Sequence, residues 1–292
     1  MKIKQGIGSR IFDVVNVIIL GLLAIVCLYP MLHVVFSAFS ESNLLMKHEG
    51  LMLRPLGFTF KSFEMVFKHP LIVKSYFNTF IAVGGSIIVN MLLTLLGAYA
   101  LSRKNVKVSS FFMKFVIVTM YFSGGLVPLF LAVKSYGLLN SYLALILPTA
   151  VNTFNLIIMR TSFMAIPDSM EESAKIDGAN DFQVLFRIMI PLAMSSIAVI
   201  ILYYTVQHWN AWFNAMVFLN DRKMYPLQLV LREILIQNDT QSMTMDVSVD
   251  GESFAEAVKY AVIVVATLPI LCLYPFLQKY FVKGVLVGAV KG

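Results

Sequence analysis

The residues best suited to do chemistry in this 292-residue chain are gathered in one polar stretch, residues 166–191. The sequence on both sides of it is almost purely apolar. Five of the chain's sixteen acidic residues lie in it: Asp168, Glu171, Glu172, Asp177 and Asp181. Carboxylates can act as general acids or metal ligands. The sequence has no paired catalytic carboxylates, metal-ligand spacing or nucleophile motif, which argues against an intramembrane enzyme.

Local signals divide the polar stretch into a separate short helix and the start of a longer one. Pro167 suits the first turn of a helix, and the acids that follow favour its positive end. Gly178 stands where a C-terminal cap would fall. Asn180 with Gln183 resembles an N-cap and its capping partner. We therefore predict a capped helix over residues 168–177.

One face of this predicted helix displays Met170, Ser173, Ala174 and Asp177. Small residues on a short amphipathic helix suit insertion into a groove on a partner. The alternative is an interfacial helix that rests on lipid. Its acidic bias fits poorly with an anionic leaflet, so we favour a protein partner.

Composition places the chain in a membrane. It is 59% hydrophobic and 13% charged, with a mean hydropathy of +0.79, whereas soluble domains are about 25% charged. A helix that crosses the hydrocarbon core needs about 20 apolar residues, and the apolar runs here are continuous, as helices require. We predict an all-α membrane protein, one domain over 1–292, with six transmembrane helices near 11–36, 75–101, 111–132, 141–159, 184–218 and 257–277.

Glycine and proline interrupt several predicted spans. Gly84 and Gly85 suit the close approach of two helix backbones. Gly124 and Gly125 mark a bend, which either lines a cavity or is a plain kink in a packed bundle. Pro191 lets the start of the fifth span bend.

The charge distribution predicts orientation. The two chain ends and the turn at 102–114 together hold ten basic residues and no acid, whereas the loops at 37–74, 133–140 and 220–259 hold ten of each. Positive loops favour the cytoplasm, so both termini and the polar stretch are predicted there. The net charge of +7 is read as these orientation signals and not as nucleic-acid binding.

The polar stretch resembles the EAA loop in the permease subunits of ATP-binding-cassette importers. The family pattern is Glu-Ala-Ala, three residues, Gly, nine residues, then Ile-x-Leu-Pro. The matching residues are Glu172, Ala174, Gly178, Ile188 and Pro191. Ser173 replaces the middle Ala and Ile190 replaces Leu. The Asp177-Gly178-Ala179 run and the run at 208–215 resemble the carbohydrate branch, the maltose-type second permease, closest to its complex-oligosaccharide and polysaccharide subgroup.

The resemblance implies a type I importer permease fold with a cytoplasmic coupling helix that docks on a separate ATPase. The chain has no G-x-x-x-x-G-K-[ST] loop, so ATP and Mg would be used by that partner and this chain would bind no cofactor. The expected partners are a homologous second permease, two ATPase subunits, an extracytoplasmic solute-binding protein, an oligosaccharide and membrane lipid, in a bacterial plasma membrane. The expected ATPase-coupling residues are Met170, Glu171, Glu172, Ser173, Ala174, Asp177 and Gly178.

A path for sugars needs amides, hydroxyls and aromatic faces, and polar residues at membrane depth are candidates for it. The expected path residues are Asn152, Asn155, Gln207, Trp209, Asn210, Trp212 and Asn214. The same residue types also form interface belts and helix–helix hydrogen bonds, so each has a purely structural alternative.

Two other functions stay open at this point. A permease of the same superfamily could carry a polyamine, phosphate or other non-sugar solute. A stand-alone secondary transporter or channel would need no ATPase, and co-purification with an ATPase separates it from an importer subunit.

Overall fold

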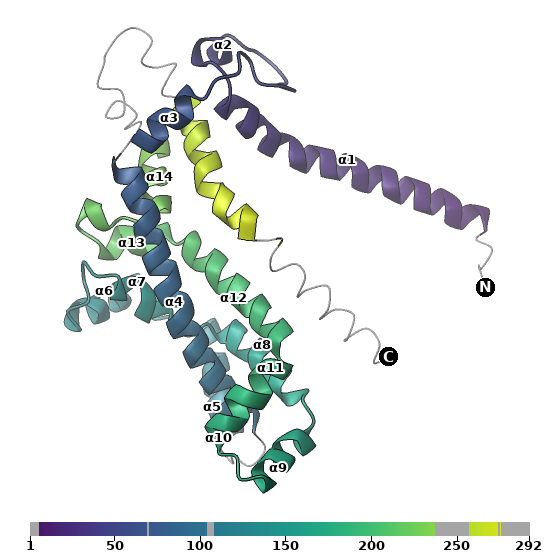
Figure 1. Cartoon of the computed structure of the whole chain (residues 1–292), viewed down its shortest axis with the longest axis vertical. Coiled ribbons are helices and arrows are strands. Elements are labelled where there is room, and N and C mark those ends of the chain that lie inside the picture. The colour runs from purple at the N-terminus through teal and green to yellow at the C-terminus, as the bar shows by residue number, and fades with distance from the viewer. Residues whose placement is uncertain (1–5, 69, 104–107, 237–256, 274, 276–292) are drawn as a thin grey trace. The chain divides into compact units, whose positions relative to one another are not determined.

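The computed structural model describes residues 6–68, 70–103, 108–236, 257–273 and 275 (Figure 1). The described residues form helices and connecting loops, and no strand occurs among them, as an all-α protein requires. The chain divides into two compact units. Met1–Pro70 and Glu233–Thr267 form the first, and Leu71–Arg232 and Leu268–Gly292 form the second.

The first unit begins with α1 (Ile7–Ala38), a continuous helix of 32 residues. The most apolar 18-residue window of this helix has no buried residue, so lipid or another subunit must cover it, whereas Ser37 and Ala38 at its end are buried. Two short helices follow, α2 (Ser42–Met46) and α3 (Lys61–Lys68). The helix Ala257–Leu273 also begins in this unit, and the rings of His33 and Tyr260 pack edge to face at 6.0 Å.

The second unit is built along α4 (Pro70–Ser102), a continuous helix of 33 residues. The next helices come in bent pairs. α5 (Ser109–Tyr121) and α6 (Leu126–Ser135) meet at 115° around Gly125, whose φ of +83° only glycine adopts readily. The segment of α7 (Leu143–Ile146) and η1 (Leu147–Thr149) meets α8 (Thr153–Met164) at 55°.

The polar stretch follows as α9 (Asp168–Ile176) and α10 (Asp181–Val184). The chain continues through a π-helical turn, η2 (Leu185–Met189), and α11 (Ile190–Leu192) into α12 (Met194–Trp209). The segment Asp181–Leu192 meets α12 at 86°. The last described helices of this unit are α13 (Trp212–Phe218), η3 (Arg222–Met224) and α14 (Leu227–Ile236).

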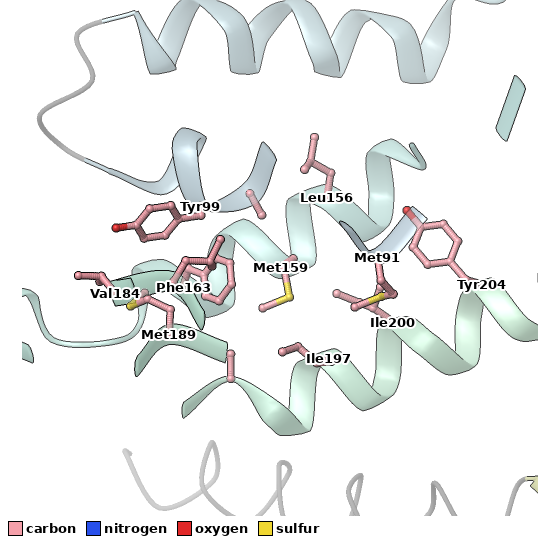
Figure 2. Close-up of a cluster of buried hydrophobic side chains, with 13 residues drawn as sticks. Met91, Tyr99, Leu156, Met159, Phe163, Val184, Met189, Ile197, Ile200 and Tyr204 are labelled. Carbon is pink, nitrogen blue, oxygen red and sulfur yellow. The ribbon is translucent and has the colours of Figure 1, made fainter. Parts of the chain in front are cut away.

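The core of the second unit lies where α4, α8 and α12 meet the segment α10–η2 (Figure 2). It is rich in methionine and aromatic side chains: Met91, Tyr99, Met159, Phe163, Met189 and Tyr204 are each at most 8% exposed. Flexible methionines fill the irregular gaps that bent helices leave between them. The core therefore holds the short segments α9 and α10 against the end of α4.

The predicted spans differ from the structure in their continuity. Only Gly8–Ala38 and Leu71–Ser102 are described helices both long and apolar enough to cross a membrane, or up to five spans if each bent pair counts as one. The described part of the last predicted span is the shorter helix Ala257–Leu273. Six spans therefore stay a prediction.

The predicted outer loop at residues 220–256 is partly helical. Arg222–Met224 and Leu227–Ile236 form η3 and α14, because Pro226 starts a run with a strongly amphipathic apolar face that packs inward at Leu227, Leu229 and Val230. Residues 237–256 lie outside the described part of the chain.

Candidate functional site

The helix α9 occupies Asp168–Ile176, within the range 168–177 in which the sequence predicts a separate helix. Its C-terminus is a Schellman cap: the N–H of Gly178 donates to the carbonyl of Lys175 at 3.0 Å, and that of Ala179 to Ala174 at 2.9 Å. Gly178 has φ +84°, which explains why glycine stands there. Pro167 precedes the first turn instead of lying in it.

The next helix begins with the predicted capping pair. The Asn180 side chain accepts from the Gln183 N–H at 2.9 Å, and the Gln183 side chain accepts from the Asn180 N–H at 2.9 Å. This reciprocal capping box satisfies two backbone donors at the start of α10. With the Schellman cap it fixes a tight turn between α9 and α10.

The inner face of α9 is held by an ion-pair network. Glu171 pairs with Arg103, the residue after α4, and accepts from Lys175 at 2.8 Å. Lys175 also lies 3.1 Å from Asp181. The side chains of Arg103 and Glu171 are only 11% and 13% exposed, so water screens this pair less than a surface pair.

The network shifts the pKa of two groups outside the membrane-spanning segments. Burial raises the pKa of the Glu171 carboxyl, but hydrogen bonds from Lys175 and Arg103 and their positive charges outweigh it and leave the pKa below its ordinary value. Hydrogen bonds to Glu171 and Asp181 raise the pKa of Lys175. Both shifts favour the charged forms of Glu171 and Lys175 at neutral pH.

Arg103 reaches beyond Glu171. Its guanidinium carbon lies 5.1 Å from the centre of the Tyr99 ring, and Nη2 is 3.4 Å from the carbonyl oxygen of Phe163 at the end of α8. The sequence analysis missed Arg103, because no local spacing indicates that a residue after one helix meets an acid 68 positions later.

The seven expected ATPase-coupling residues divide between two faces of α9. Met170, Glu172, Ser173, Asp177 and Gly178 are exposed, while Glu171 faces Arg103 and Ala174 packs against the core. The outer face also carries Ile176, which is 86% exposed and was not among the expected residues. A surface with Met170 and Ile176 on a rigidly capped helix can insert into a hydrophobic groove.

A second feature is a cavity of about 330 Å³ in the second unit, between α4, α7, the end of α12 and the start of α13. Four expected path residues line it: Gln207, Asn210, Trp212 and Asn214. The lining also includes the hydroxyls of Thr79, Ser86 and Thr149, and it contains no Asp, Glu, Lys or Arg. An uncharged polar lining with an aromatic face matches the hydroxyls and ring faces of a sugar.

The other three expected path residues have structural roles. Asn152 caps α8, where its side chain accepts from the Asn155 N–H at 3.1 Å. Asn155 is 2% exposed. Trp209 is 4% exposed and packs edge to face on Phe80, with ring centres 5.8 Å apart. None of the three lines the cavity.

Behind the cavity, polar side chains join α4 to α12. Nδ2 of Asn90 lies 2.7 Å from Nε2 of His208, and the Thr94 and Tyr204 hydroxyls are 2.7 Å apart. The Tyr204 hydroxyl also accepts from the Asn152 N–H at 3.1 Å. His208 lines the cavity, and the sequence analysis did not select it as a path residue. The i,i+4 spacing of Ser86, Asn90 and Thr94 is the signal that could have indicated a polar face on α4.

Among the described residues, no group of three or more His, Cys, Asp or Glu side chains could hold a metal ion. The candidate site therefore has two parts, the exposed capped helix α9 and the uncharged cavity. Helices α4 and α12 lie between these two parts.

Comparisons with known proteins point to membrane transport components. Residues 90–287 match the family model described as the binding-protein-dependent transport system inner membrane component. The chain is 43% identical, over 97% of its length and 99% of the relative's, to the polygalacturonan/rhamnogalacturonan transport system permease protein YtcP of Bacillus subtilis. It is 41% identical to Protein LplC of the same organism, with 98% and 96% covered. A chain of the crystal structure of a bacterial ABC transporter involved in the import of the acidic polysaccharide alginate is similar with a TM-score of 0.87 and 31% identity, covering 96% of this chain and all of that one.

Proposed function

The chain belongs to the family of binding-protein-dependent transport system inner membrane components, and from that membership we propose that it is the permease subunit of an ATP-binding-cassette importer for oligosaccharides. It is a transport component and not an enzyme. ATP hydrolysis belongs to separate subunits, because the sequence contains no phosphate-binding loop.

The proposed assembly has a homologous second permease, two ATPase subunits and an extracytoplasmic solute-binding protein. The chain would cross the bacterial plasma membrane six times with both termini in the cytoplasm, in line with its basic turns. The unburied apolar length of α1 supports contact with lipid or with the second permease.

The observation that carries the proposal is the two-faced character of α9. Its outer face, with Met170 and Ile176, is exposed, and its inner face is fastened to Arg103 by Glu171. A helix that only linked two spans would need neither two caps nor a partly buried ion pair. The outer face is the proposed docking surface for the ATPase.

The cavity supports a carbohydrate substrate. Its amides and hydroxyls can bind neutral polar groups, and no Asp or Glu lines the cavity to pair with a polyamine. The guanidinium carbon of Arg232 lies 4.4 Å from the centre of the Trp212 ring, which places a positive charge beside the lining. YtcP and the similar crystal structure are named for the transport of polygalacturonan, rhamnogalacturonan and alginate, which favours a polysaccharide-derived oligosaccharide over a monosaccharide.

Affinity purification from native membranes tests the assembly and the solute class together. The tagged chain should bring down a second permease, an ATPase and a binding protein, identified by mass spectrometry. That binding protein should bind an oligosaccharide in a calorimetric solute screen. Tight binding of an amino acid or inorganic anion instead would contradict the sugar assignment, and a chain that purifies active without an ATPase would contradict the importer assignment.

A further inference from the structure

The helix α4 is the one described element that contacts both the α9 network and the cavity. It runs without a break from Pro70 to Ser102, with α10 near its C-terminal end and α7 and α13 beside its middle part (Figure 1). Thr79, Ala82, Val83 and Ser86 line the cavity, while Tyr99 and Arg103 lie at the α9 network. A continuous helix transmits a displacement along its axis because its backbone hydrogen bonds keep its length nearly fixed.

The C-terminal end of α4 is attached to α9 and α8 through the side chains of two arginines. Arg103 pairs with Glu171 of α9, donates from Nε to the Ser102 hydroxyl at 3.1 Å and stacks on Tyr99. Arg160 of α8 donates to the carbonyl of Leu101 at 2.9 Å. A movement of α9 must therefore either move α4 or break a largely shielded ion pair, which costs more than breaking an exposed one.

The inner part of α4 is fastened to α12 in the same way. Asn90 and Thr94 are 0% exposed, and their partners His208 and Tyr204 stand one turn apart on α12. The residues that follow on α12 and its C-terminal loop, Gln207 and Asn210, line the cavity. A displacement of α4 thus reaches the cavity lining directly through the Asn90–His208 contact, while the Thr94–Tyr204 hydrogen bond attaches α4 to the same helix one turn away.

We propose that α4 moves as one rigid rod that carries the displacement of α9 to the cavity. Arg103 and Asn90 are the positioning residues at its two points of attachment, to α9 and to α12, which are called the first and second fastening. This inference rests on the proposed function, in which the ATPase moves α9. Glu171 then holds α9 to its own chain, and Glu172, Met170 and Ile176 are left for the partner. Tyr99 and Phe163, whose rings pack edge to face at 6.3 Å, support the fastening from the core side (Figure 2).

A double-mutant cycle on the purified importer tests the first fastening. Arg103→Gln and Glu171→Gln should each lower sugar uptake in proteoliposomes by about 3- to 30-fold, the range for mutations along a coupling network. ATP hydrolysed per sugar imported should rise, while the ATPase still co-purifies. Because both changes break one contact, the double variant should be no worse than the poorer single. Arg103→Lys, which keeps the charge, should retain more uptake than Arg103→Gln.

The exposed pair Glu64–Lys68 is the matched control. It is also an ion pair, at 2.7 Å, but its side chains are 62% and 73% exposed and it lies outside the proposed rod. Glu64→Gln and Lys68→Gln should leave the ratio of ATP to sugar unchanged. Equal effects at this pair and at Arg103–Glu171 would show a general charge effect and overturn the proposal.

The second fastening is tested by combining distant substitutions. Asn90→Ala should also raise the ratio of ATP hydrolysed to sugar imported. If α4 is one rod, Asn90→Ala added to Arg103→Gln should cost little more than either alone, although the sites are far apart on α4. Fully multiplicative losses would mean that the two contacts act independently and would contradict the rod.

Two results separate this inference from the proposed function. If the wild-type complex hydrolyses ATP without importing any oligosaccharide, the proposed function fails. If instead the wild type imports sugar while the folded Arg103 and Asn90 variants all keep the wild-type ratio of ATP hydrolysed to sugar imported, only the proposed role of α4 fails. Melting temperature and size-exclusion profile show which variants fold.

Discussion

Two adjacent glutamates of α9 have opposite surroundings. The Glu171 side chain is 13% exposed and pairs with Arg103, whereas Glu172 is exposed on the outer face. The EAA pattern matches Glu172 and does not include Glu171. Their roles should therefore separate by experiment: Glu172→Ala should weaken ATPase binding, measured by co-purification yield, whereas Glu171→Gln should keep the ATPase bound and lose coupling. Loss of ATPase binding in Glu171→Gln alone would reverse this assignment.

The attachment of α9 should depend on pH at both extremes. The pKa of Glu171 is lowered, so its contribution is complete above the ordinary glutamate value of about 4.3 and disappears as the pH falls through the lowered pKa. The pKa of Lys175 is raised, so its contribution is complete below about 10.4 and disappears as the pH rises through the raised pKa. Near neutral pH the attachment should be constant.

Hydrogen exchange of the α9 amides measures this dependence, after correction for the intrinsic effect of pH. Protection should fall in acid in the wild-type chain and be lower and independent of acid pH in Glu171→Gln. A protection profile that is the same in both chains would show that the ion pair does not hold α9.

Gly178 occupies a backbone conformation that other residues adopt only with strain. With φ at +84° and no atom within 4 Å of an added Cβ, substitution is limited by conformation and not by space inside this chain. Gly178→Ala should cost about 1 kcal/mol in the cap, and Gly178→Asp should lower uptake further by placing a side chain at the docking surface. Gly84→Ala, in a helix and also without a neighbour within 4 Å, is the control and should keep normal uptake. Unchanged uptake in Gly178→Asp would contradict the docking surface.

The two tryptophans, three positions apart, should respond differently to truncation. Trp212 lines the cavity and Trp209 is buried against Phe80. Trp212→Ala should raise the sugar concentration needed for half-maximal uptake with little change in melting temperature. Trp209→Ala should instead lower stability by about 3–5 kcal/mol, as for large buried aromatics. The opposite pattern would move the substrate path away from this cavity.

Residue types alone could not separate these roles. The sequence selected Gln207, Asn210, Trp212 and Asn214, which line one cavity in the structure because they follow one another in the chain. It also marked Asn152, which caps a helix, because it treated residues 141–159 as one continuous span. The caps at Gly178 and Asn180 were predictable since each depends on a few neighbouring residues.

At the scale of elements, the sequence indicated where helices are interrupted, but it did not predict the angles between the helix segments. Gly124-Gly125 and Pro191 each predicted a bend; the structure bends by 115° at Gly125 and by 86° between Leu192 and Met194, just after Pro191. Glycine and proline weaken a helix locally. The angle depends on which distant helix the next segment packs against, and local sequence carries little information on that.

The two neighbouring glycines of α4 offer a test of helix packing. A Cβ on Gly85 would lie 2.9 Å from Cδ1 of Ile146 in α7, whereas a Cβ on Gly84 meets nothing within 4 Å. Gly85→Leu should therefore overpack the α4–α7 contact and lower the free energy of unfolding by about 1–3 kcal/mol. Gly84→Leu should have a smaller effect, and melting temperatures in detergent compare them. Equal losses in both variants would contradict close packing of α4 on α7.

At the scale of the whole molecule, the chain is incomplete as a transporter by itself. The apolar window of α1 is unburied, Met170 and Ile176 of α9 are exposed, and the sequence has no nucleotide-binding loop. Composition predicted the membrane location and the helical class, because apolar content limits where a chain can fold. It could not predict which described helices form spans alone and which form them in bent pairs.

The central claim is that this chain imports oligosaccharides only when a separate ATPase moves α9. Proteoliposomes that contain the purified complex, with ATP inside and the sugar-loaded binding protein outside, measure it directly. The account predicts sugar accumulation that requires ATP, the binding protein and an intact Gly178, and that persists when ion gradients are collapsed. Accumulation that continues without ATP, or that stops when a proton or sodium gradient is removed, would contradict it.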